Sequence, residues 1–263
     1  MQMSARCRVL LSLAVALALG MGQAALATTS YPNYFGPNVS FTGTQETSTF
    51  GDPEPLFGAP TGSLDQLLFF PTNFTASASG AGGSDSTGSQ LQTLITSTAP
   101  GAKINILNIS EFGDAALTGT GTSATGVMAG MSGFVTVLEV NGAAITPVII
   151  GFNAGGMTPV NGSFSPVAVG FPGLTLPGNA GTTIWSGSVS INIASIVPNA
   201  TKVMLSFDND LYAYSEADTT AKIQKKVVDG PAIVIQVIPE PGTAALLGGG
   251  LLALSLRKRA RRA

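Results

Sequence analysis

Short runs in which apolar and polar residues alternate recur along most of this 263-residue chain. In residues 188–193 every second side chain is Val or Ile, so the apolar side chains of a strand would all face one way. Residues 134–140 alternate similarly before Asn141-Gly142, a dipeptide typical of tight hairpins. The pattern predicts strands at Asn38–Thr42, Leu64–Phe70, Gln90–Thr96, Lys103–Ile109, Gly133–Glu139, Pro147–Phe152, Thr183–Ile193, Thr201–Phe207, Ala221–Val228 and Ala232–Ile238.

About ten short strands separated by turn residues predict an all-β fold, an antiparallel β-sandwich that is jelly-roll-like or a Greek key. A β-solenoid is the alternative, but the chain has no fixed repeat period. Ala76–Ser89, which is rich in Ser, Gly and Ala, is predicted to be a loop, and the proline-rich Gly151–Ala180 to hold long connections or edge strands. Tyr31–Pro60 is predicted to wrap the edge of the domain.

The two ends of the chain have a different pattern. Met1–Ala27 has a short basic start, an apolar stretch at Val9–Leu19, and small residues at Ala25 and Ala27. This pattern is typical of a secretory signal peptide cleaved after Ala27, because the apolar stretch is too short to span a membrane. The expected organisation is a signal peptide at 1–27, a β-sandwich body at 28–238 and a C-terminal signal at 239–263.

The C-terminal signal has three parts in order. Pro239, Glu240 and Pro241 are expected to form an extended strip, because proline disfavours both a helix and pairing inside a sheet. The uncharged segment Thr243–Leu256 follows; as a helix it would be about 21 Å long, short for a hydrocarbon core of about 30 Å. A basic cluster follows and is expected to stay on the cytoplasmic side of the membrane: Arg257, Lys258, Arg259, Arg261 and Arg262.

This tail resembles the PEP-CTERM sorting signal, found on exported proteins of Gram-negative bacteria that make exopolysaccharide. The resemblance covers only the C-terminal signal. It implies a short apolar sorting helix that inserts transiently into the inner membrane, and processing by exosortase at or near Pro-Glu-Pro. Signal peptidase would act at the other end. The protein would then reach the cell surface or the extracellular matrix, either released or covalently attached.

Composition excludes several kinds of chemistry. The chain has no histidine, and its one cysteine, Cys7, lies in the signal peptide. The body therefore has no disulfide, no thiol nucleophile and no His- or Cys-bound metal. Residues 28–238 contain five lysines and every acidic residue of the chain except Glu240, a net charge of −8. Such a body is not expected to bind nucleic acid.

Three acidic residues within the segment 208–216 suggest a cation site. Asp208 and Asp210 lie two apart and would point the same way in a strand, and Glu216 follows closely. Hard carboxylate oxygens at such positions could bind Ca²⁺. The alternative is an ordinary turn, because Asp and Asn favour turns. No other cofactor is expected.

Aromatic residues suggest a contact with sugars. Trp185, Tyr212 and Tyr214 could stack on the CH faces of sugar rings, and the two tyrosines would share a face of a strand. The alternative for Trp185 is a place in the core. Lys222, Lys225 and Lys226 are interpreted as solvent-exposed residues of an edge strand, where their charges would prevent pairing with another sheet.

The expected function is a structural or adhesive role near exopolysaccharide, without catalysis. One alternative is a carbohydrate-binding module, with or without Ca²⁺. The other is a secreted glycan hydrolase with paired carboxylates, although no motif selects such a pair.

The resemblance generates a prediction about processing. The intact mass of the mature protein recovered from the cell surface should correspond to a C-terminus near residues 239–241. Deletion of Arg257–Arg262 should leave the precursor stalled or mislocalised, because the basic cluster sets the membrane topology. Surface protein that still ends at Ala263 would contradict processing. Normal processing of the deletion variant would show that the basic cluster is not required for it.

Overall fold

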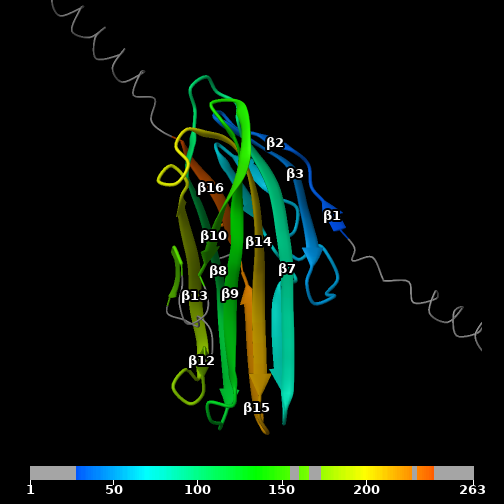
Figure 1. The fold of residues 1–263 in the computed structure, drawn as a ribbon. Coiled ribbons are helices and arrows are strands. Elements are labelled where there is room, and N and C mark those ends of the chain that lie inside the picture. Colours follow the sequence, from blue (N-terminus) through cyan, green and yellow to red (C-terminus); the bar gives the residue numbers. More distant parts are fainter. Residues whose placement is uncertain (1–27, 155–159, 166–172, 227–229, 240–263) are drawn as a thin grey trace, which may run out of the picture.

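The computed structural model describes residues 28–154, 160–165, 173–226 and 230–239. These residues form two antiparallel sheets that pack face to face, and the long strands run along the length of the molecule (Figure 1). In the described ranges there is no helix. The predicted antiparallel β-sandwich is therefore confirmed. The sorting helix expected after Pro241 and the signal peptide lie outside the described residues.

The first sheet is built around its longest strands. Its order is β1 (Thr28–Ser30), β3 (Val39–Ser48), β7 (Gly83–Ser97), β14 (Ala200–Ser215), β9 (Gly126–Val140) and β10 (Ala143–Asn153). Two short strands extend it: β2 (Tyr34–Phe35) pairs with β3, and β12 (Leu174–Thr175) pairs with β9. Strand β14 is central, because it pairs along its length with β7 on one side and β9 on the other.

The second sheet is organised by β8 (Ile104–Gly119). Its order is β11 (Gly162–Ser165), β13 (Gly181–Asn192), β8, β16 (Ile233–Pro239), β5 (Gln66–Phe69) and β4 (Thr61–Ser63). One edge of β8 pairs with β13, whereas the other edge pairs first with β16 and then with β15 (Thr219–Lys225). Strand β6 (Thr75–Ser79) pairs with the free side of β15. Strand β15 is therefore an interior strand of this sheet.

The sequence pattern located most of these strands, with one clear error. Each predicted run overlaps an observed strand. Ala76–Ser89, however, is not a loop, because it contains most of β6 and the first half of β7. Its small residues are needed where other groups approach closely: a Cβ atom on Gly88 would lie 2.3 Å from Oδ1 of Asp210 and 2.7 Å from the ring of Phe50.

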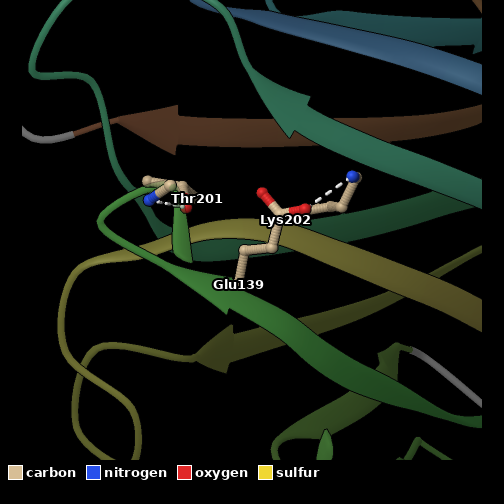
Figure 2. Close-up of polar contacts among 4 residues, drawn as sticks. Glu139, Thr201 and Lys202 are labelled. Carbon is tan, nitrogen blue, oxygen red and sulfur yellow. Dashed lines mark hydrogen bonds and ion pairs between the residues drawn. The ribbon is translucent and has the colours of Figure 1, made fainter. Parts of the chain in front are cut away.

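The Asn141-Gly142 turn joins β9 to β10 as its composition predicts. Both residues have positive φ angles, 51° and 80°, which the two-residue hairpin turns require. The amide of Gly142 donates a 2.9 Å hydrogen bond to Oγ1 of Thr201 on β14. Figure 2 shows this contact beside the ion pair of Lys202 Nζ with Glu139 Oε1, 2.7 Å apart across β14 and β9. These contacts fix the end of three neighbouring strands.

The core between the sheets is apolar and rich in aromatic rings. Phe57 lies at its centre and makes edge-to-face contacts with Phe69, Phe74 and Phe207, with centroid distances of 5.6, 5.5 and 5.8 Å. Phe207 belongs to β14 and Phe69 to β5, so this cluster joins the two sheets. Phe57 itself comes from the loop that follows β3.

Replacing Phe57 by Ala should lower the free energy of unfolding by about 3–5 kcal/mol, because the change removes a fully buried ring and leaves a cavity. Denaturant titration of the full chain measures this difference. Phe35→Ala is the matched control, because Phe35 is 69% exposed and its loss should cost less than about 0.5 kcal/mol. Equal effects of the two substitutions would contradict the central role of Phe57.

Candidate functional site

The strand β14 presents four polar and aromatic side chains on the outer face of the first sheet. Side chains at 205, 207, 209, 211 and 213 are buried between the sheets, whereas those at 208, 210, 212 and 214 lie on the outer face. Asp208 and Asp210 thus share a face, as do Tyr212 and Tyr214, in agreement with the period of a strand. The structure places the two predicted pairs in one row.

A groove of about 570 Å³ lies at one end of this row. We call it the β14 groove. Its aromatic wall consists of Phe50, Tyr212 and Tyr214, and its acidic side of Asp52 and Asp85. The remaining lining residues are Ser84, Ser86, Met128 and Ala213.

The aromatic wall is partly exposed and has a defined geometry. The ring of Phe50 meets that of Tyr212 edge to face, with centroids 5.8 Å apart and an interplanar angle of 71°. Phe50 is 46% exposed. Burial raises the pKa of both groove tyrosines, and Asp210 adds to the rise for Tyr212, so both phenols remain neutral near pH 7. The wall therefore offers apolar ring surface together with uncharged hydroxyl groups.

Phe50 and Asp52 reach the groove because the loop between β3 and β4 is fixed at both ends. At its start, the amide of Thr49 donates to the carbonyl oxygen of Gly88 at 2.9 Å. At its far end, the amides of Leu56 and Phe57 donate to the buried carboxylate of Glu46, at 2.7 and 3.2 Å. One carboxylate therefore holds the loop that supplies part of the groove.

The groove is acidic, and the pKa values of one carboxyl group that lines it and of one beside it are raised. Burial raises the pKa of Asp52, an effect that a main-chain hydrogen bond from Gly88 opposes and the charge of Asp85 strengthens. Oδ2 of Asp52 is buried, and no residue of the described ranges is its hydrogen-bond partner. Beside the groove, burial and the neighbouring Asp208 raise the pKa of Asp210 to about 6.

The three predicted calcium ligands do not come together. Asp208 accepts a hydrogen bond from Nε2 of Gln90 at 3.1 Å. Glu216 lies beyond the end of β14, where its carboxylate accepts hydrogen bonds from Thr122 and from Oγ1 of Thr125. In the described part of the chain, no group of three or more acidic side chains is arranged to hold a metal ion.

Trp185 is separate from the two tyrosines. It lies on the inner face of β13 with 2% of its surface exposed and packs against Phe164, with centroids 6.1 Å apart. Its ring is covered in this structure, so the prediction that it contacts a glycan together with Tyr212 and Tyr214 is wrong. The alternative place in the core is correct.

The interpretation of the lysines near residue 225 is also only partly right. Lys222 and Lys226 are exposed, and Lys226 pairs with Asp114 at 2.8 Å. Lys225 instead points between the sheets and pairs with Glu111, and neither side chain has any exposed surface. Because β15 lies between β6 and β8, it is not an edge strand.

Sequence reasoning missed Phe50, Asp52 and Asp85 as parts of the groove. Phe50 and Asp52 lie about 160 positions before the tyrosines that they approach. Asp85 stands in the Ser- and Gly-rich stretch that was predicted to be a loop. The segment Gly51-Asp52-Pro53 has the composition of a turn, but composition does not show which distant strand the turn contacts.

The remaining predicted site residues fall mostly outside the described ranges: Ala25, Ala27, Glu240, Pro241 and the basic cluster at 257–262. Pro239 is the last residue of β16 and lies opposite Ile104 of β8 after a register shift, so the expectation that it stays outside the sheet is wrong. Within the described ranges, no helix is long and apolar enough to cross a membrane.

Residues 237–262 match the PEP-CTERM protein-sorting motif. The match confirms the resemblance seen in the tail, and it implies an exported protein that exosortase handles at the membrane. It covers only the C-terminal region, so it says nothing about the sandwich. No curated protein matches the chain significantly.

Similar solved structures include a protein of the infectious bursal disease virus Gx strain, with 15% identity and a TM-score of 0.19 over 77% of this chain and 56% of the viral chain. A mutant of ENZbleach xylanase has 10% identity and a TM-score of 0.17 over 76% of this chain and 85% of the enzyme chain. The chain thus spans about half the length of the viral protein. At these scores neither likeness carries an argument about fold or function.

The raised pKa of Asp210 predicts how stability depends on pH. This carboxyl titrates near 3.8 when unfolded and at about 6 when folded, so ionisation costs more in the folded state. The cost is absent below about pH 4 and complete above about pH 6. Asp210→Asn should therefore raise the free energy of unfolding at pH 7.5 by about 1 kcal/mol, after allowance for solvent screening, and by much less at pH 4.

Denaturant titrations at the two pH values measure this difference. Asp218→Asn is the matched control, because Asp218 is exposed and has a positive φ angle that Asn tolerates. A gain for Asp210→Asn that is equal at pH 4 and pH 7.5 would contradict the assignment.

Proposed function

We propose that the exported body is a non-catalytic protein of the cell surface or extracellular matrix that binds exopolysaccharide in the β14 groove. The observation that carries this proposal is the partly exposed aromatic wall of Phe50, Tyr212 and Tyr214 beside the carboxyl groups of Asp52 and Asp85, of which Asp85 is exposed. Aromatic faces accept the CH faces of sugars, and carboxylates accept hydrogen bonds from sugar hydroxyl groups. The PEP-CTERM motif supports delivery to a place where such polymers occur.

The charge of the groove narrows the class of glycan. Asp52 and Asp85 line it, Asp210 lies beside it, and residues 28–238 carry an excess of acidic over basic groups. A strongly anionic polymer would be repelled at such a site. Neutral polysaccharides, or those that carry amino sugars, are therefore the expected ligands.

Catalysis is not part of the proposal. A glycan hydrolase needs two carboxyl groups that flank a bound glycosidic bond with different protonation states. Asp208 and Asp210 stand two positions apart on one strand, and Asp208 is hydrogen-bonded to Gln90. Their arrangement favours a binding surface, and a hydrolase would be revealed by turnover that Asp208→Asn abolishes.

Tyr212→Ala should weaken binding of the processed protein to the polysaccharide of the producing bacterium by about tenfold or more, because a stacking face is lost. Isothermal titration calorimetry with neutral, amino-sugar and anionic fractions measures the affinity, with and without Ca²⁺. Phe134→Ala is the matched control, since Phe134 is a partly exposed aromatic residue on the same sheet but outside the groove.

Three results would overturn the proposal. The first is wild-type affinity in Tyr212→Ala, and the second is an equal loss in Phe134→Ala. The third is the absence of saturable binding to every fraction, which would leave a passive matrix component or a protein partner. A strict requirement for Ca²⁺ would instead support the predicted cation site near Asp208 and Asp210.

A further inference from the structure

A second polar cluster lies inside the sandwich, and none of its residues lines the β14 groove. Lys225, the last residue of β15, and Glu111 of β8 come from one sheet, and Asn209 of β14 comes from the other. The side chains of Lys225 and Glu111 have no exposed surface, and Asn209 is fully buried. An amine, a carboxylate and a carboxamide thus meet in the core, shielded from water.

The three groups converge on one atom. Oε2 of Glu111 accepts a hydrogen bond from Nδ2 of Asn209 at 2.6 Å and another from Nζ of Lys225. Oδ1 of Asn209 and Oε1 of Glu111 are buried, and the described residues give neither a hydrogen-bond partner. Unpaired buried polar atoms are uncommon in native interiors and require an explanation.

The burial of the amine makes its proton easier to lose than that of a solvated lysine. Nζ of Lys225 lies 5.0 Å from the ring centroid of Phe74 and 5.2 Å from that of Trp185. Burial among these rings lowers the pKa of Lys225, although the charge and hydrogen bond of Glu111 oppose the effect. A desolvated lysine next to a carboxylate that can take its proton has the two features of an activated amine nucleophile.

We infer that Lys225 and Asn209 become joined by an intramolecular amide bond, with Glu111 as the general base. Nζ of Lys225 transfers a proton to Glu111 and then attacks Cγ of Asn209. The bond between Cγ and Nδ2 breaks, Nδ2 receives the second proton that Nζ releases, and ammonia leaves. An ammonium, a carboxylate and a carboxamide become an amide, a carboxylic acid and ammonia, without any oxidant or co-reactant.

The reaction solves two physical problems of this fold. It removes a buried ion pair, whose desolvation is costly in an apolar core. It also links β14 of one sheet covalently to β15 of the other. Exported domains are commonly cross-linked by disulfides, which this body cannot form because its only cysteine lies in the signal peptide region.

Mass spectrometry of the wild-type protein tests the bond directly. The processed protein, recovered after export, is denatured, reduced and digested with trypsin. From residue 202 to residue 226, trypsin can cut only after the lysines at 202, 222, 225 and 226. Asn209 therefore lies in the peptide 203–222, and Lys225 lies beyond it. Trypsin does not cut after an acylated lysine, so a bond at Lys225 yields a branched peptide in which 203–222 carries 223–226, lighter than the sum of its parts by one ammonia.

Variants assign the roles. Lys225→Met and Glu111→Gln should each restore the full sequence mass, whereas the matched control Lys226→Met, at an exposed lysine, should keep the ammonia loss. Asn209→Asp should form the same bond with loss of one water instead. Because the wild-type digest needs no variant, a misfolded variant does not affect the test.

Separate peptides at full mass in the wild-type digest would overturn the inference and leave a plain buried ion pair. Loss of one water in the wild type would also overturn it, because that loss places the bond on a carboxylate. Retention of the ammonia loss in Lys225→Met would exclude Lys225.

Discussion

The buried carboxylate of Glu46 is the contact on which both the core and the groove depend. A carboxylate inside a sandwich is stable only when donors surround it. Glu46 accepts hydrogen bonds from the amides of Leu56 and Phe57, from Oγ of Ser89 and from the hydroxyl of Tyr31, whose pKa burial and this contact raise. The donors thereby place Phe57 in the core and, through the same loop, bring Phe50 to the groove.

Strand β14 then separates two kinds of chemistry by its pleat alone. Successive side chains point to opposite faces, so Asn209 enters the interior while Asp208 and Asp210 stay outside. Inside, low polarity makes an amine and a carboxylate mutually dependent. Outside, the same strand offers tyrosines and carboxyl groups to solvent. The central position of β14 between β7 and β9 makes both arrangements rigid.

Much of the fold could be predicted from period and turn chemistry, and the failures have physical causes. The strand 188–193 and the Asn141-Gly142 hairpin follow local rules, because neighbouring residues decide them. The stretch Ala76–Ser89 looked like a loop because its residues are small, yet Gly88 is small because Asp210 and Phe50 pack against it. Lys225 looked like a solvated lysine because nothing nearby in the sequence shows that Glu111 is its partner.

The sequence by itself determined the sorting tail, the absence of histidine and of cysteine beyond Cys7, and the alternation that makes a sandwich. Each of these is a local or compositional property. Only the tertiary structure decided which polar groups meet, such as Glu111 with Asn209 and Lys225, or Phe50 with Tyr212. The reason is that these contacts join strands and loops far apart in the chain, and strand pairing and sheet packing, not sequence neighbours, bring them together.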